Sequence, residues 1–366
     1  MTASCAPEAV VSVLSASPPG VAAGPRPTRS HLDAVDERSG PIREVVLLRA
    51  AEGLWTALAL GSSTPGSAGI PVLCHGTATS ADAGDARDRA IYEALERYCA
   101  GFWSVEELRP APAAGATDGA SEGPEVAMRT LDGSAEVLAP AARVYLPFAH
   151  GGRCYDGDSV GLACGRSDED ALDRAVDELL ERWLVEPWVR SRCSADPEPG
   201  PDATLAAERA TVIGRVALGA CTRHVAVAML GADRPPYGAL GFGCHATEAQ
   251  ALQKALAEAR HVRAHMVMLA SEGRRPQRRP AVGLEAALHR AAFDRPVAAR
   301  FNAAMDAASP QDPWPLRRLA HRDVLWRNLT TPEVRSMGLE VVRAVFSPAL
   351  GKPPPMPDSG WPPQLG

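Results

Sequence analysis

DARDRAIYEALERY, residues 85–98, and DALDRAVDELLERW, residues 170–183, are two copies of one sequence. Nine of the fourteen aligned positions are identical. A third, weaker copy starts at position 250 and keeps Ala255 and Glu258, so the copies begin 85 and then 80 residues apart. Self-similarity of this kind is typical of a repeated supersecondary unit. We therefore expect an internally pseudo-symmetric domain rather than a solenoid.

Each of the first two copies carries a pair of glutamates followed by an arginine. Residues three apart share one face of a helix, so Glu93 and Glu96 point the same way. The same holds for Glu178 and Glu181. If the pseudo-symmetry brings the helices together, four carboxylates meet, and they repel one another or hold protons unless cations lie between them. Oxygen ligands without cysteine or histidine favour Mg²⁺, which commonly serves a nucleotide's phosphates.

The alternative is that these acids are ordinary surface charges. Glu-x-x-Glu-Arg is common on solvated helices, where a pair such as Glu93 with Arg97 adds only about 0.2–0.5 kcal/mol. The duplication favours a site, because glycine-containing turns at residues 76–80 and 159–165 precede the two helices at similar distances. Repeated turn and helix units with acids at matching positions are hard to explain as ordinary solvent-exposed charges.

In these blocks the chain resembles the YcaO family of ATP-dependent enzymes, which modify the peptide backbone. The resemblance is carried by residues 76–98, by residues 161–182, by the third copy with its preceding residues 241–245, and by a proline-alternating tail. Residues 32–41 are similar to the segment that opens the domain in the azole-forming branch. The blocks are specific jointly rather than singly, and together they span nearly the whole chain.

The resemblance implies an α+β fold, a YcaO-type pseudo-symmetric single domain built from repeated helix and sheet units. Residues 1–30 are rich in Ala, Pro, Ser and Gly and are expected to be a disordered tail. The YcaO domain is expected at residues 31–352 and a proline-rich tail at residues 353–366. Independently of the resemblance, residues 45–48 and 54–60 are predicted to be strands around a Glu-Gly turn.

The activity implied by the resemblance is ATP-dependent cyclodehydration of a ribosomally made precursor peptide. A Cys, Ser or Thr side chain adds to the preceding backbone carbonyl, the oxyanion takes the γ-phosphoryl group of ATP, and loss of phosphate leaves a thiazoline or oxazoline. The implied Mg²⁺ ligands are Glu93, Glu96, Glu178 and Glu181. The residues expected to bind ATP are Arg89, Arg97, Ser159, Gly161, Arg182 and Arg263. The expected catalytic residues, in a rigid polyproline segment that orders the substrate, are Pro353, Pro355 and Pro357.

Some positions depart from the family's pattern at expected nucleotide contacts. The family usually has other residues at the positions of Ala78, Arg89, Val160 and His261. Two hypotheses stay open for Arg89, where the family has serine. It contacts an ATP phosphate in place of the serine hydroxyl, or it pairs with Asp85 on the surface, as Arg174 in the matching place of the second copy suggests.

Two classes of function follow. The first is the enzyme, with thioamidation and amidine formation as alternatives to azoline formation. The second is a non-catalytic YcaO-like scaffold of a peptide-modification complex, motivated by Arg89 and Val160. The expected partners are the precursor peptide and a separate E1-like, leader-binding protein, because no extra domain for capturing a leader is recognisable. A homodimer is left open.

Composition excludes several other classes. The 366 residues carry a net charge of −6, which gives no electrostatic footprint for nucleic acid. No apolar run reaches the roughly 18 residues of a membrane span. No basic residue precedes the short apolar patch at residues 9–14, so a secretory signal is not expected and the cytoplasm is the expected location. The eight cysteines show no Cys-x-x-Cys pair, which argues against zinc.

Overall fold

The computed structural model describes most of the chain between residues 30 and 350, together with a short N-terminal strand. The described residues are 12–14, 30–37, 40–49, 53–62, 64–67, 69, 72, 74–110, 123–155, 157–193, 205–271, 284–307 and 316–350. They form a mixture of helices and sheets, which confirms the α+β class. The chain divides into two compact units: residues 1–179 with 321–350, and residues 180–320 with 351–366.

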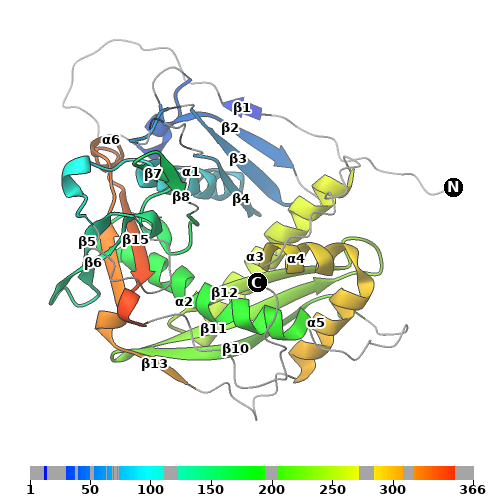
Figure 1. Cartoon of the computed structure of the whole chain (residues 1–366). Helices are drawn as coiled ribbons and strands as arrows, with labels where there is room; N and C mark the ends of the chain where they lie inside the picture. Colours follow the sequence, from blue (N-terminus) through cyan, green and yellow to red (C-terminus); the bar gives the residue numbers. More distant parts are fainter. Residues whose placement is uncertain are drawn as a thin grey trace. The chain divides into compact units, whose positions relative to one another are not determined.

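The first sheet of the first unit packs against the helix that contains the first sequence copy. Its order is β1-β2-β3-β4, with all neighbours antiparallel. The strands are β1 (Ser12–Leu14), β2 (Ile42–Arg49), β3 (Trp55–Gly61) and β4 (Gly76–Ser80). Helix α1 (Ala83–Ala100) packs against β3 and β4 (Figure 1). It begins at Asp82, whose side chain accepts a hydrogen bond from the backbone N–H of Asp85 at 2.8 Å.

The second sheet of this unit joins segments that are far apart in the sequence. Its order is β6-β5-β14-β15-β9, again antiparallel throughout. The strands are β5 (Glu125–Thr130), β6 (Glu136–Pro140), β9 (Leu162–Gly165), β14 (Val324–Asn328) and β15 (Glu340–Phe346). The C-terminal strands β14 and β15 therefore lie between β5 and β9. A separate hairpin is formed by β7 (Phe148–His150) and β8 (Arg153–Tyr155).

Short helices connect these strands. The α-helix α6 (Pro332–Arg335) links β14 to β15. The 3-10 helices are η1 (His31–Ala34), η3 (Val105–Glu107), η4 (Ala141–Arg143), η5 (His321–Asp323) and η6 (Pro348–Leu350). The long helix α2 (Asp168–Cys193), which contains the second sequence copy, follows β9 and runs from the first unit into the second.

The second unit is built on one four-stranded sheet. Its order is β12-β11-β10-β13, where only the β10–β13 pair is parallel. The strands are β10 (Arg209–Leu218), β11 (Cys221–Gly231), β12 (Gly238–His245) and β13 (Arg317–Leu319). Helix α3 (Glu248–Ser271), the third sequence copy, packs on β11 and β12. Helices α4 (Leu284–Phe293) and α5 (Arg295–Ala307) complete the unit.

The expected repetition is visible in how strand and helix pack within each unit. A Cβ on Gly76 of β4 would lie 2.0 Å from the carbonyl oxygen of Ala90 in α1. A Cβ on Gly241 of β12 would lie 2.3 Å from the carbonyl oxygen of Ala255 in α3. Both contacts therefore need glycine, since no other residue lets the strand approach so closely. The alanines that recur in the three copies are fully buried: Ala86, Ala90, Ala94, Ala171, Ala175, Ala251, Ala255 and Ala259.

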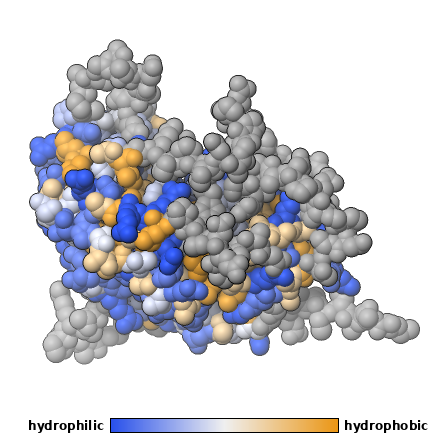
Figure 2. Space-filling view, turned by 90° about the horizontal axis from the view of Figure 1, so that it is seen from below, coloured by the Kyte–Doolittle hydropathy of each residue, from blue (hydrophilic) through white to orange (hydrophobic). Residues whose placement is uncertain are grey.

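In the face drawn in Figure 2, hydrophobic residues form small groups between hydrophilic ones. Among the described residues, no helix is long and apolar enough to cross a membrane.

Candidate functional site

Both carboxylate oxygens of Glu93 are held by neighbours in the first unit. Oε2 accepts a hydrogen bond from the backbone N–H of Thr77 at 2.7 Å. Oε1 pairs with Nη2 of Arg97 at 2.6 Å, and Arg97 also donates to the carbonyl oxygen of His75. The two side chains are about one-third exposed, at 31% and 32%. Because each carboxylate oxygen has a second lone pair, Glu93 can still bind a cation in this arrangement.

Glu96 lies one helical turn further along α1 and contacts the second sheet. Its Oε1 accepts a hydrogen bond from the backbone N–H of Cys164 in β9 at 2.8 Å. Burial raises the pKa of Glu96 well above its usual range, and the negative charges of Glu178 and Glu93 raise it further. Glu93 and Glu178, two further predicted metal ligands, thus lie within electrostatic reach of Glu96. A cation would relieve the mutual repulsion that these carboxylates feel.

Glu181 is the fourth predicted ligand and lies one turn beyond Glu178 on α2, in the second unit. Among the described residues, no three His, Cys, Asp or Glu side chains are grouped closely enough to hold a metal by themselves. Mg²⁺ is commonly bound by one or two carboxylates together with waters and substrate phosphates. A Mg²⁺ held by Glu96 and Glu178 would therefore need waters and nucleotide phosphates to complete its coordination.

The turn that contains Ser159 and Gly161 leads directly into β9. The carbonyl oxygen of Ser159 accepts from the N–H of Leu162 at 3.0 Å. Gly161 has φ +79°, and a Cβ there would lie 2.3 Å from the carbonyl oxygen of Ala344 in β15. Only glycine satisfies both the left-handed backbone and this close approach. The turn is therefore a rigid lead into the strand whose Cys164 N–H contacts Glu96.

Arg89 has the contacts expected of a surface arginine. Its Nη1 lies 3.8 Å from Oδ2 of Asp85 and 3.5 Å from the carbonyl oxygen of Thr79, and both charged side chains are 53% exposed. The matching Arg174 pairs with Asp170 at 2.8 Å. The ion pair with Asp85 is long and exposed, so giving it up to bind a phosphate would cost little free energy. Both hypotheses for Arg89 remain compatible with the geometry.

The third copy repeats the carboxylate contact of the first. In the second unit, Oε2 of Glu258 accepts from the backbone N–H of Phe242 at 2.7 Å. The same contact joins Glu93 to Thr77, and in both cases donor and acceptor are sixteen residues apart. Arg182 and Arg263 are also in this unit, on α2 and α3. The expected catalytic residues Pro353, Pro355 and Pro357 lie outside the described residues.

Sequence reasoning missed three groups at this site. Two are the backbone N–H donors of Thr77 and Cys164, which no side-chain motif reveals. The third is Arg343, a buried cation on β15 that Glu178 influences electrostatically. Its signal in the sequence is a lone charge inside the apolar run of residues 341–346.

A sequence model of the YcaO family, described as YcaO cyclodehydratase with ATP and Mg²⁺ binding, matches residues 117–350 of the chain. The chain belongs to the YcaO family. The resemblance seen in the sequence is thereby confirmed, and ATP and Mg²⁺, the cofactors expected from it, are those of the family. A search among curated protein sequences found no match.

Several solved structures share the fold at low sequence identity. The structure of YcaO from Methanopyrus kandleri bound with AMPPCP and Mg²⁺ has a TM-score of 0.53 and 17% identity, covering 85% of this chain and 86% of that one. A heterocyclase in complex with substrate and cofactor has a TM-score of 0.54 and 16% identity, and the match covers 86% of this chain and 51% of that one. The E. coli microcin synthetase McbBCD complex has a TM-score of 0.55 and 12% identity, and the match covers 85% of this chain and 89% of that one. These likenesses show that the chain has the YcaO fold.

Proposed function

We propose that this chain is a peptide cyclodehydratase that uses Mg²⁺ and ATP to form thiazoline or oxazoline rings from Cys, Ser or Thr residues of a ribosomally made precursor peptide. The observation that carries the proposal is the position of Glu96, a carboxylate held by the Cys164 N–H in the strand that follows the glycine turn, with Glu178 within electrostatic reach. Such carboxylates are stabilised by a divalent cation, and family membership supplies the ATP-dependent chemistry.

The residues of this chain have three proposed roles: binding Mg²⁺, binding ATP and ordering the substrate. Glu93, Glu96, Glu178 and Glu181 would hold Mg²⁺, with Glu96 fixed by the Cys164 N–H. Arg97 neutralises part of the charge of Glu93, and the remaining expected ATP contacts are Arg89, Ser159, Gly161, Arg182 and Arg263. When bound, Mg²⁺ and ATP supply the phosphoryl group that turns the amide oxygen into a good leaving group. The prolines at 353, 355 and 357 would order the peptide substrate.

The proposed partners are the precursor peptide and an E1-like, leader-binding protein. Two relatives support this: a heterocyclase solved with its substrate, and the McbBCD complex solved with pro-MccB17 bound. The proposed organisation is a disordered tail at residues 1–30, the YcaO domain at residues 31–352 and the proline-rich tail at residues 353–366. The proposed location is the cytoplasm.

One observation favours a second candidate function, a non-catalytic scaffold in a peptide-modification complex. Arg89 stands where the family usually has serine, and it contacts Asp85 and the carbonyl oxygen of Thr79. If these contacts keep the guanidinium away from the nucleotide, a polar contact to ATP is lost. The retention of all four glutamates speaks for the enzyme.

The test is reconstitution of the chain with a precursor peptide, its partner protein, ATP and Mg²⁺. We expect phosphate release coupled to the loss of one water from the peptide for each ring, measured by mass spectrometry. Exchange of a peptide oxygen for sulfur would instead identify thioamidation. A complex that forms but releases no phosphate would support the scaffold. The matched control is the same mixture with Glu178→Gln.

A further inference from the structure

Arg343 is a charged residue in the middle of a buried strand. Its neighbours on β15, Val342 and Ala344, are fully buried, and the Arg343 side chain is itself only 5% exposed. A buried guanidinium is unfavourable unless charges and hydrogen bonds compensate it. The contacts of the Arg343 guanidinium therefore indicate which groups compensate its charge.

The three nitrogen atoms of the guanidinium have different surroundings. Nε donates to the carbonyl oxygen of Arg143 at 3.0 Å, and Nη2 donates to Oδ1 of Asp158 at 3.3 Å. Asp158 is 73% exposed, so it is a weak counter-ion. Nη1 is buried and has no hydrogen-bond partner among the described residues. These contacts thus compensate the charge of Arg343 only in part.

The contacts of Arg343 lead to the turn at residues 158–161. Oδ1 of Asp158, which binds Arg343, also accepts from the backbone N–H of Val160 at 3.0 Å. The next residue on β15, Ala344, donates its N–H to the carbonyl oxygen of Gly161 at 2.7 Å. Two consecutive residues of β15 therefore hold the two ends of this turn. The strand that follows carries the Cys164 N–H that binds Glu96.

Electrostatics connects Arg343 to the predicted metal ligands as well. Burial lowers the pKa of Arg343, while the charges of Asp158 and Glu178 raise it. Glu178 therefore lies within electrostatic reach of the guanidinium.

We propose that Arg343 is a positioning residue of the nucleotide site, which fixes the turn at residues 158–161 through Asp158. This inference rests on the proposed function, in which the turn serves ATP. Arg343 does not have to touch the nucleotide, because its effect passes through the turn.

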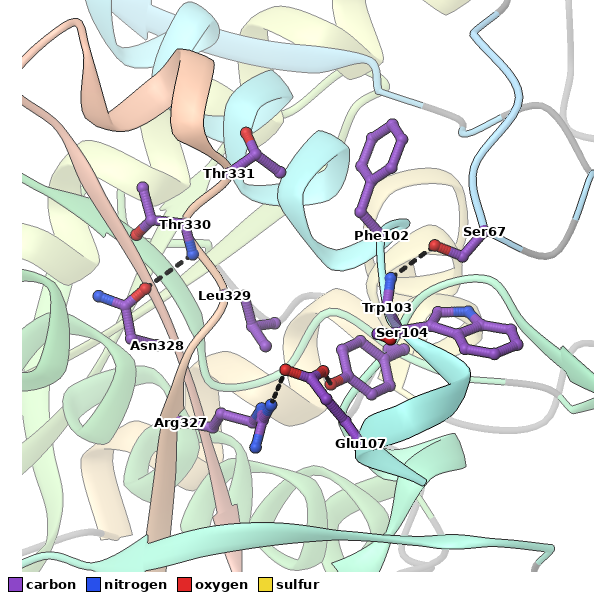
Figure 3. A pocket seen from close by; sticks show the side chains of 11 residues that line it. Ser67, Phe102, Trp103, Ser104, Glu107, Arg327, Asn328, Leu329, Thr330 and Thr331 are labelled. Carbon is purple, nitrogen blue, oxygen red and sulfur yellow. Dashed lines mark hydrogen bonds and ion pairs between the residues drawn. The ribbon is translucent and has the colours of Figure 1, made fainter. Parts of the chain in front are cut away.

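The opposite residue on the neighbouring strand provides a matched control. Arg327 on β14 is paired in register with Arg343. Figure 3 shows its guanidinium turned toward Glu107, which it contacts at 2.9 Å, and Nη1 donates to the carbonyl oxygen of Ala127 at 2.8 Å. Replacing Arg327 thus removes an arginine from the same sheet without touching the turn at residues 158–161.

The experiment measures binding of a non-hydrolysable ATP analogue by calorimetry, over a series of Mg²⁺ concentrations, together with the melting temperature. The variants are Arg343→Met, Arg343→Lys, Asp158→Ala and the control Arg327→Met. We expect Arg343→Met to weaken binding about tenfold or more and to raise the Mg²⁺ concentration needed. Arg343→Lys should recover part of the affinity, because it restores the charge but not the forked hydrogen bonds.

Asp158→Ala keeps the inference testable if Arg343→Met does not fold, since Asp158 is largely exposed. It should weaken binding with little change in melting temperature. Binding equal to wild type in the folded Arg343 variants and in Asp158→Ala would overturn the inference, as would an equal loss in Arg327→Met. If the wild type itself binds no nucleotide with Mg²⁺, the proposed function fails and this inference with it.

Discussion

Replacing Gly161 with alanine tests a close backbone contact in the turn that leads into β9. Gly161 has φ +79°, where an L-residue with a Cβ is unfavourable by about 1–2 kcal/mol. The new Cβ would also lie 2.3 Å from the carbonyl oxygen of Ala344, a backbone atom that cannot rotate away. Overpacking of this kind typically destabilises by about 1–3 kcal/mol. The sum for Gly161→Ala is a loss of about 2–5 kcal/mol in the free energy of unfolding.

Gly338 provides a control that separates the two contributions. It has φ +73°, but a Cβ there would meet nothing within 4 Å. Gly338→Ala should therefore lose only the backbone contribution of about 1–2 kcal/mol. Urea unfolding of the wild type and both variants gives the comparison through the midpoint and slope of each transition. Equal destabilisation by the two substitutions would refute the close packing of the turn against β15.

Three further predictions concern stability, nucleotide affinity and the tail. Burial raises the pKa of Glu340, but hydrogen bonds from Asn328, Arg335 and Thr330 outweigh it and hold the pKa below its usual range. The ionised group thus stabilises the fold above its unfolded-state pKa, and the advantage of wild type over Glu340→Gln should shrink from about pH 5 downward in pH-dependent melting. If Arg89 contacts a phosphate, calorimetry should show weaker and less salt-sensitive nucleotide binding for Arg89→Ser; unchanged affinity at low and high salt would mark a surface residue. Deleting residues 353–366 should reduce cyclised peptide, measured by mass spectrometry, far more than nucleotide binding; equal loss of both would point to a structural tail.

Features with a local cause could be predicted from the sequence. The alanine stripes follow from the 3.6-residue period of a helix, and the structure confirms that these alanines are buried in α1 and α2. The strands predicted at residues 45–48 and 54–60 are confirmed as β2 and β3. β2 extends beyond the predicted range at both ends, by one to three residues, and β3 is shifted by one residue, which is within the usual uncertainty of strand ends.

Features that depend on distant segments could not be predicted in this way. The insertion of β14 and β15 between β5 and β9 joins strands almost 200 residues apart, and no local pattern encodes such pairing. The same is true of the Cys164 N–H that binds Glu96, and of the Ala344 carbonyl that restricts residue 161 to glycine. Gly161 was identifiable from its motif, but the physical reason for it lies in β15.

The central claim is that the glutamates of the first two sequence copies serve a Mg²⁺ ion that acts on ATP. The most direct measurement is Mg²⁺-dependent nucleotide turnover by Glu93→Gln and Glu178→Gln, with melting temperatures as a check on folding. The control is Glu186→Gln, two turns beyond Glu178 on α2, where Glu186 pairs with Arg190 on the exposed side. We expect both site variants to fold and to lose turnover, while the control keeps it. Wild-type turnover in either Glu93→Gln or Glu178→Gln would contradict the claim.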